Sequence, residues 1–215
     1  PAPLGGFGHF LCGLQPGETA SMKIKKPREI HGSLEIHGRW SHLGLVAGGT
    51  GVAPFVQIVR SLLAKSEDRT QISLLSINRF EEDILMRREL DELAAQHPDR
   101  FRVSYSLTQA TEAWEGFRDR GSVEMARSAL PSPSLSDCNA GSPEGDDATC
   151  KAEDAAGGGV MIMVCGTDGF RESWAGPVVK IKADPARGIK KQKLQGPLLG
   201  WLKAAGFTEE QVYKF

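Results

Sequence analysis

The stretch LGLVAGGTGVAP, residues 43–54, decides how the rest of the chain is interpreted. It begins with a short apolar run, continues with a glycine-rich turn, and leads into residues 52–64, whose apolar side chains have helical spacing. A glycine turn between a strand and a helix lets the backbone approach a phosphate, and the first N–H groups of the helix are available to it. A tight turn without any ligand would require the same glycines, and the residues alone leave both explanations open.

Strands and helices alternate along most of the remaining sequence. Each predicted strand is largely apolar, which is typical of a parallel sheet that helices cover on both faces. The sequence therefore predicts an α/β fold, in which residues 43–215 form a doubly wound parallel-sheet nucleotide-binding domain. The predicted strands are residues 43–47, 71–77, 101–107 and 160–165, and the predicted helices are residues 52–64, 81–96, 122–130 and 170–181.

Residues 1–42 have a different pattern. Residues 21–25 and 34–37 alternate apolar with polar side chains, as the strands of an antiparallel sheet do. Two such short strands cannot bury a core of their own. We therefore predict that residues 1–42 are a partial antiparallel β-barrel segment, the C-terminal remnant of a barrel domain, and we expect the chain to begin inside a longer protein.

Two polar segments interrupt the nucleotide-binding domain. Residues 131–159 consist mainly of Pro, Ser, Gly, Asp and Ala and contain almost no large apolar side chains. Such a segment buries too little surface to offset the entropy that ordering would cost, so we predict a disordered insertion. Residues 180–193 are rich in lysine and are predicted to form a solvated loop.

Charge and cysteine content narrow the class of protein. The formal net charge of −1 gives no electrostatic support for binding to nucleic acid. No apolar run is long enough to span a bilayer, so we expect no membrane contact within this segment. The four cysteines and five histidines have no metal-ligand spacing, and no metal site is predicted. Unpaired cysteines favour a cytoplasmic protein, with a Cys138–Cys150 disulfide and membrane attachment through sequence upstream of residue 1 as alternatives.

A second motif, VCGTD at residues 164–168, lies at the carboxyl end of the strand predicted at 160–165. Ligands of doubly wound sheets bind outside the carboxyl ends of the strands, so both motifs are expected to face one crevice. Cys165 is equally well explained as a small core residue. No base lies beside it in the sequence, and nucleophilic catalysis by this thiol is not predicted.

The residues after the strand at 71–77 bear on the choice between NADH and NADPH. An acidic side chain at this position accepts hydrogen bonds from ribose hydroxyls and repels a phosphate, so Asp83 favours NADH. Arg79 would instead pair with the additional phosphate of NADPH. Acidic residues at 81–83 are also expected simply because they favour the start of a helix.

Several motifs occur in the order that they have in one known family. GLVAGGTGVAP, EEDILMRRELDELAAQHPDRFRVSYSL, VMIMVCG and the terminal VYKF together resemble the NADH-cytochrome b5 reductase family of the ferredoxin–NADP reductase-like flavoenzymes. The resemblance implies an FAD-binding antiparallel barrel followed by an NAD(P)H-binding α/β domain. It also implies a flavoprotein oxidoreductase that transfers hydride from NADH to FAD and then electrons to a haem-protein acceptor such as cytochrome b5. An NADPH-preferring reductase of the same superfamily and a non-catalytic interaction module without flavin are the alternatives.

The resemblance assigns roles to individual positions. Cys165 would be the catalytic residue, since the family's Cys-Gly pair lies beside the nicotinamide where hydride passes to flavin. Thr50 would lie near the flavin ring, and Asp83 matches the acidic residue associated with NADH preference. Gly8 and Thr167 depart from the family pattern, which has a serine and a proline at these positions. The implied cofactor-binding residues are Gly48, Gly49, Thr50, Gly51, Pro54, Asp83, Gly166, Thr167 and Phe215 for the dinucleotide side, and Gly6 and Gly8 over the flavin pyrophosphate.

Overall fold

The computed structural model describes residues 7–23, 29–30, 33–137, 158–181 and 192–215. The chain divides into two compact units, Pro1–Leu34 and Glu35–Phe215. The larger unit contains the predicted nucleotide-binding domain, and the smaller unit contains the helix α1 (Phe7–Gly13).

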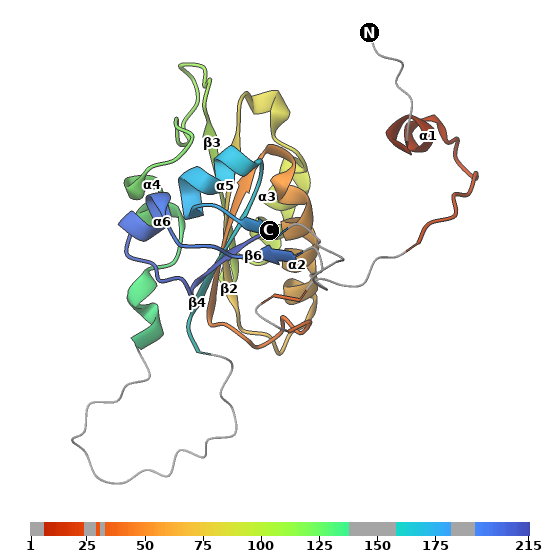
Figure 1. Cartoon of the computed structure of the whole chain (residues 1–215). Helices are drawn as coiled ribbons and strands as arrows, with labels where there is room; N and C mark the ends of the chain where they lie inside the picture. Colours follow the sequence, from red (N-terminus) through yellow and green to blue (C-terminus); the bar gives the residue numbers. More distant parts are fainter. Residues whose placement is uncertain (1–6, 24–28, 31–32, 138–157, 182–191) are drawn as a thin grey trace, which may run out of the picture. The chain divides into compact units, whose positions relative to one another are not determined.

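A five-stranded parallel sheet forms the centre of the larger unit. The strand order is β3-β2-β1-β4-β7, so the chain builds outward from β1 in one direction and then in the other (Figure 1). The inner residues of β1 are all buried, because helices cover both faces of the sheet. The strands are β1 (His42–Gly48), β2 (Gln71–Asn78), β3 (Phe101–Leu107), β4 (Val160–Cys165) and β7 (Val212–Lys214). The predicted α/β fold with a doubly wound parallel sheet is confirmed.

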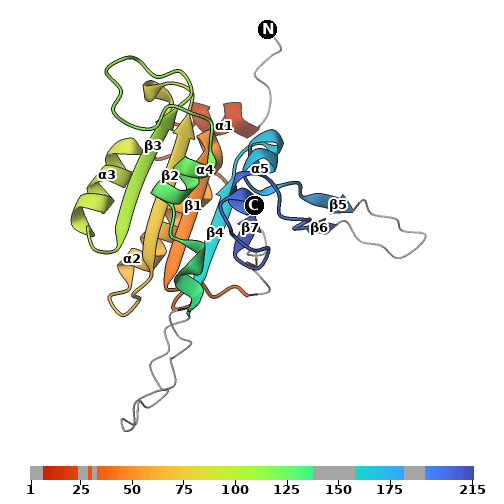
Figure 2. The ribbon, with the colours of Figure 1, turned by 90° about the vertical axis from the view of Figure 1, so that its left-hand side faces the viewer.

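Helices form a layer on each side of the sheet (Figures 1 and 2). On one side lie α2 (Ala53–Ala64) and α3 (Arg87–Gln96), and on the other lie α4 (Val123–Ala129), α5 (Asp168–Ala175) and α6 (Gly200–Ala204). Alternate residues of a strand point to opposite faces. The face toward α4, α5 and α6 therefore buries every second residue of the central strands, and its core includes Val46, Leu75, Ile77, Ile162, Val164, Phe170 and Trp174.

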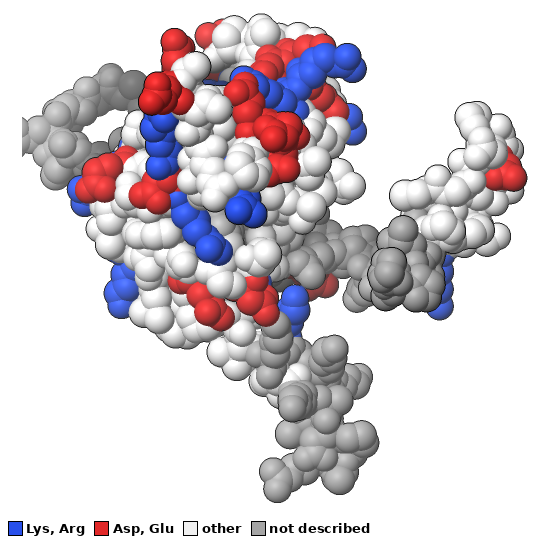
Figure 3. Space-filling view, turned by 90° about the horizontal axis from the view of Figure 1, so that it is seen from above, with Lys and Arg blue, Asp and Glu red and all other residues white. Residues whose placement is uncertain are grey.

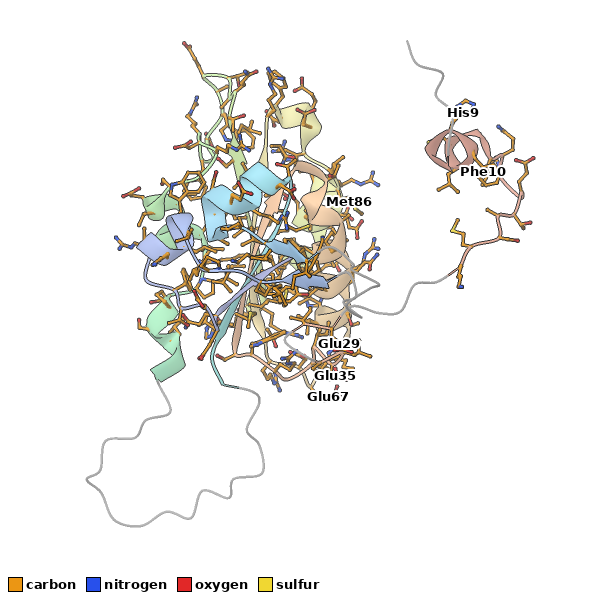
Figure 4. The ribbon with its side chains drawn as sticks, in the orientation of Figure 1. His9, Phe10, Glu29, Glu35, Glu67 and Met86 are labelled. Atoms are coloured by element: carbon orange, nitrogen blue, oxygen red, sulfur yellow. The ribbon has the colours of Figure 1, made fainter. Side chains whose placement is uncertain are left out.

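Two predicted helices have different bounds in the structure. Residues 81–96 divide into a 3₁₀ turn, Glu81–Asp83, and α3, because Met86 (labelled in Figure 4) adopts a left-handed conformation with φ of 58°. The helix predicted at 170–181 is wrong beyond Ala175, because Gly176 has a φ of 86° and Pro177 follows it.

The segment after α5 contains a small antiparallel ribbon. Its strands are β5 (Val179–Ile181) and β6 (Gln192–Leu194). The prediction of a loop over residues 180–193 is therefore wrong at both ends. Residues 182–191 lie outside the described residues.

The antiparallel strands predicted within residues 1–42 are not found in the described part of that segment. Residues 21–23 and 34–37 belong to no strand, and residues 24–28 lie outside the described residues. The only β pairing there among described residues is one isolated bridge between Ile30 and Ser33. A short strand is stable only when neighbouring strands satisfy its backbone, and no neighbouring strand occurs in the described part of residues 1–41.

The larger unit begins before the boundary predicted at residue 42. Trp40 is buried, and its carbonyl oxygen accepts a hydrogen bond from Thr70 Oγ1 at 3.0 Å. The buried carboxylate of Asp68 accepts hydrogen bonds from the backbone N–H of Gly38 at 3.1 Å and from Thr70 at 2.9 Å, and it contacts His37 Nδ1 at 3.2 Å. Burial acts to raise the pKa of Asp68, but these hydrogen bonds outweigh it and lower the pKa below its ordinary value.

The predicted insertion begins later than residue 131. Pro131 is buried, and residues Pro133–Asp137 form a 3₁₀ turn, so the prediction of disorder is wrong for these residues. Gln211 Nε2 donates a hydrogen bond to the carbonyl oxygen of Pro133 at 3.0 Å, which fixes the turn to the domain. Residues 138–157, with Cys138 and Cys150, lie outside the described residues.

Replacing Asp68 by Asn is expected to lower the free energy of unfolding by about 1–3 kcal/mol at neutral pH, because the charge that these donors stabilise is lost. The folded-state pKa of Asp68 lies below 3.8, so its stabilisation is complete above that value and disappears as pH falls through the folded-state pKa. Urea unfolding of the wild type and Asp68→Asn across this range measures the difference.

The control is Glu67→Gln. Glu67, labelled in Figure 4, precedes Asp68 at the edge of the sheet opposite α5, and it is exposed. This variant should unfold like the wild type. A stability loss in Asp68→Asn that stays the same at low pH would contradict the explanation.

Candidate functional site

The carboxyl ends of β1 and β4 are neighbours in the sheet. Ala47 pairs with Cys165 in the β1–β4 register, so the glycine turn and the VCGTD motif begin at the same edge. The strand order reverses at this pair of strands, because β2 follows on one side of β1 and β4 lies on the other. Ligands of doubly wound sheets bind at such a reversal.

Each of the three glycines of the turn is required for a different structural reason. Gly49 has a φ of 54°, and no atom lies within 4 Å of the place where its Cβ would be. A Cβ on Gly51 would overlap the carbonyl group of Cys165, whose carbon lies 2.6 Å from that place. A Cβ on Gly48 would lie 2.8 Å from the ring of Phe170. Gly49 therefore allows the turn, whereas Gly48 and Gly51 allow β4 and α5 to pack closely against it.

A cleft of about 580 Å³ opens at this edge of the sheet. Residues from the carboxyl ends of β1, β2 and β3, from the 3₁₀ turn at Glu81–Asp83 and from the start of α5 line it. We call it the strand-end cleft, and the lining residues used below are Gly48, Gly49, Thr50, Asn78, Arg79, Glu82, Asp83, Thr108, Arg120, Thr167 and Phe170.

Five of the predicted site residues line the strand-end cleft: Gly48, Gly49, Thr50, Asp83 and Thr167. Thr167 also begins α5, since its Oγ1 accepts a hydrogen bond from the backbone N–H of Phe170 at 3.4 Å. The exposed Asp83 accepts a hydrogen bond from the backbone N–H of Phe80 at 3.2 Å. Asp83 thus caps the 3₁₀ turn and lines the cleft at the same time.

The other predicted residues of the larger unit lie beside the cleft without lining it. Gly51 is buried against Cys165, and Pro54 belongs to the first turn of α2. Cys165 ends β4 and Gly166 directly follows it, and both are partly exposed. Phe215 follows β7, where its N–H donates to the carbonyl oxygen of Val164 at 3.0 Å. Its ring is edge-on to those of Phe55 and Tyr213, with centroid distances of 5.5 and 5.3 Å.

The two glycines predicted to hold flavin belong to the smaller unit. Gly6 lies outside the described residues, and Gly8 belongs to α1 of the smaller unit. Their assignment stays a prediction.

Among the lining residues named above, sequence reasoning missed Asn78, Thr108, Arg120 and Phe170. Asn78 ends β2 and Thr108 directly follows β3, so the rule that ligands bind at carboxyl strand ends would have found both. Arg120 and Phe170 lack such a signal, because long-range packing brings them to the cleft.

Side chains of both charges line the strand-end cleft, with Arg79 and Arg120 beside Glu82 and Asp83. Figure 3, which views the molecule from above the α5 edge, shows Lys and Arg interspersed with Asp and Glu on this face.

Two buried cations hold the last strand in place. Arg171 donates to the carbonyl oxygen of Phe215 at 2.6 Å and forms an ion pair with Asp168. Burial lowers the pKa of Lys214, whose Nζ donates to three backbone carbonyl oxygens. These belong to Pro177, Gly196 and Pro197, at 3.2, 3.1 and 2.8 Å. The two cations therefore fix where Phe215 lies relative to the end of β4.

The described residues contain no group of three or more His, Cys, Asp or Glu side chains that could hold a metal ion. Among the same residues, no helix has the length and apolar character needed to cross a bilayer. Cys12 and Cys165 carry thiols, exposed and partly exposed respectively.

Replacing Gly51 by Ala is expected to lower the free energy of unfolding by about 1–3 kcal/mol, because the new Cβ overlaps the Cys165 carbonyl and the strand ends must move apart. Urea unfolding measures the change. The matched control is Gly169→Ala in α5, where no atom lies within 4 Å of the new Cβ and where alanine favours the helix. Equal stability of Gly51→Ala and the wild type would show that the strand ends are not in close contact.

Comparison with solved structures supports the fold. The cytochrome b5 reductase domain of Ulva prolifera nitrate reductase superposes with a TM-score of 0.61 at 22% identity, over 98% of this chain and 66% of that chain. The CS-b5R domains of human Ncb5or give a TM-score of 0.56 at 20% identity, over 99% of this chain and 46% of that chain.

Comparison of sequences identifies the family. The model of the family described as "Oxidoreductase NAD-binding domain" matches residues 45–175. NADH-cytochrome b5 reductase 2 of Botryotinia fuckeliana is 30% identical over 99% of this chain and 51% of its own length. The NADH-cytochrome b5 reductase-like protein of Arabidopsis thaliana is 31% identical over 99% of this chain and 53% of its own length, so the chain spans about half of these relatives. The chain belongs to the oxidoreductase NAD-binding domain family, together with the NADH-cytochrome b5 reductases.

Proposed function

We propose that this chain supplies the NADH-binding part of a flavoprotein oxidoreductase, which transfers hydride from NADH to FAD and then electrons to a haem protein such as cytochrome b5. The observation that carries the proposal is the meeting of the glycine turn and the Cys165 strand end at the edge of one cleft. The names of the relatives point to the same reaction.

The strand-end cleft has the groups that a dinucleotide needs. The turn at Gly49–Thr50 leads directly into α2, so backbone N–H groups and the positive end of the helix face the pyrophosphate. The carboxylate of Asp83 accepts hydrogen bonds from the ribose hydroxyls. Asn78 and Thr108, at the carboxyl ends of β2 and β3, would contact the adenine.

The nicotinamide end of the dinucleotide lies toward Cys165 and Phe215. Cys165 is partly exposed at the end of β4, and the ring of Phe215 is held by Phe55 and Tyr213. Arg171 and Lys214 fix the backbone at Phe215. The position of the Phe215 ring relative to the Cys165 thiol is therefore fixed as well. These residues would orient the nicotinamide, and bound flavin would supply the hydride acceptor.

The flavin contacts implied by the resemblance involve both units of the chain. Gly8 lies in the smaller unit, Gly6 is outside the described residues, and only Thr50 of the larger unit is assigned to the flavin by resemblance. We therefore propose FAD as a cofactor of the whole protein, to which this chain contributes the dinucleotide side. A cytoplasmic location is proposed on the cysteine pattern, with membrane attachment through other sequence as the alternative.

An NADPH-preferring reductase is the second candidate. Arg79 lines the strand-end cleft beside Glu82 and Asp83, and its guanidinium is exposed to solvent. An arginine at this position would pair with the additional phosphate of NADPH.

Titration of the chain with each nucleotide is expected to give tighter binding of NADH than of NADPH. Because Asp83 accepts hydrogen bonds from the ribose, Asp83→Asn should weaken NADH binding about tenfold and raise the affinity for NADPH relative to it. Isothermal titration calorimetry measures both affinities.

Glu92→Gln is the control, because Glu92 is an exposed acidic residue of α3 that does not line the cleft. It should leave both affinities unchanged. Failure of the wild type to bind either nucleotide would refute the proposed function, and a preference for NADPH would establish the second candidate.

A further inference from the structure

The loop of residues 108–121, between β3 and α4, carries Arg120 to the strand-end cleft. The loop is tied to β3 at Phe117, whose N–H donates to Tyr105 O at 3.1 Å and whose carbonyl oxygen accepts from Leu107 N at 3.0 Å. Trp114 Nε1 donates to the same carbonyl oxygen at 3.0 Å. These contacts give the loop a defined path across the end of the sheet.

The backbone at Arg120 is fixed from the opposite side by α5. The indole N–H of the fully buried Trp174 donates to the carbonyl oxygen of Arg120 at 3.1 Å. Gly121 has a φ of 155°, and a Cβ there would lie 2.8 Å from the Trp174 ring and would also overlap Trp201. The loop therefore packs against α5 beside Arg120, and a hydrogen bond from the buried core holds the Arg120 backbone.

The two arginines of the cleft differ in what holds their side chains. Arg79 Nε donates to Gln109 Oε1 at 3.1 Å, and its guanidinium lies 5.1 Å from the centroid of the Phe80 ring. The Arg120 side chain is exposed, and the described part of the chain provides no hydrogen-bond or ion-pair partner for its guanidinium. A fixed backbone that presents an available guanidinium to a cleft is suited to binding an anion.

A cation in the cleft would offset the repulsion between a bound phosphate and the acidic side chains of the lining. Glu82 and Asp83 contribute negative charge to its lining, which repels phosphate groups. The glycine turn offers the backbone N–H groups of Gly49 and Thr50 and the hydroxyl of Thr50, but it has no charged side chain. A guanidinium binds a phosphate through two parallel hydrogen bonds and offsets its charge.

We propose that Arg120 binds a phosphate group of the dinucleotide in the strand-end cleft, an assignment that rests on the proposed function. Two phosphate groups have this chemistry. The pyrophosphate is common to NADH and NADPH, and the 2′-phosphate occurs in NADPH alone. Arg120 strengthens the binding of both nucleotides in the first case and selects NADPH in the second.

Binding of ADP, 2′-AMP and adenosine to the wild-type chain and to Arg120→Gln tests the assignment. ADP carries the pyrophosphate, 2′-AMP carries the 2′-phosphate, and adenosine carries neither. The variant should bind one phosphorylated probe at least about tenfold more weakly, as expected for the loss of a charge-assisted hydrogen bond, and should bind adenosine as the wild type does. The wild-type affinity for that probe should also fall more steeply with salt than that of the variant.

The control is Arg127→Gln, which removes the same charge from an exposed position of α4 outside the cleft. It should bind all probes as the wild type does, and Arg120→Lys should retain part of the affinity. A loss confined to ADP assigns Arg120 to the pyrophosphate, and a loss confined to 2′-AMP assigns it to the 2′-phosphate.

Three results would overturn the assignment. The first is equal binding of both phosphorylated probes by the wild type and Arg120→Gln, which leaves the proposed function intact. The second is an equal loss of adenosine binding, which would mean that the substitution acts through the fold. The third is a wild-type chain that binds none of the probes and neither dinucleotide, which would refute the proposed function as well.

Discussion

The close approach of the glycine turn to the end of β4 is the constraint on which the rest of the structure depends. A side chain at position 51 would occupy the same space as the carbonyl group of Cys165, and one at position 48 would enter the ring of Phe170. Without side chains there, β1 and β4 pair as far as Ala47 and Cys165, and α2 and α5 begin beside each other at the same edge. The strand-end cleft exists because these two helices start from adjacent points and then diverge to opposite faces of the sheet.

In this arrangement one side of the cleft would bind the phosphates and adenosine, and the other side would position the nicotinamide. The turn at Gly49, the ends of β2 and β3, and Arg120 surround the space for phosphates and adenosine. The end of β4 and Phe215, which Arg171 and Lys214 hold, form the side toward the nicotinamide. Both sides rest on buried groups of the same core, since Trp174 supports Arg120 and lies in α5 with Arg171. The cofactors carry out the chemistry, and the protein holds these two sides of the cleft in a fixed position relative to each other.

The sequence predicted the central sheet well, because strands that are buried on both faces are apolar throughout. Residues 101–107 and 160–165 correspond to β3 and β4 without a shift, and the glycine turn lies where it was expected. The division of the helix at Met86 was missed, because methionine rarely adopts a positive φ and no local pattern indicates it. The end of α5 had a signal in Gly176-Pro177 that the apolar spacing after it obscured. Strands of three residues, such as β7, are too short to show a period, and the cleft position of Arg120 depends on Trp174, more than fifty residues away in sequence.

Hydrogen–deuterium exchange of the chain with and without NADH tests most directly whether the two strand ends form one nucleotide site. NADH is expected to slow exchange of the backbone amides at residues 48–52 and at residues 165–168 together, since both segments would border the bound dinucleotide. Protection of only one segment, or protection confined to residues elsewhere in the chain, would contradict this expectation.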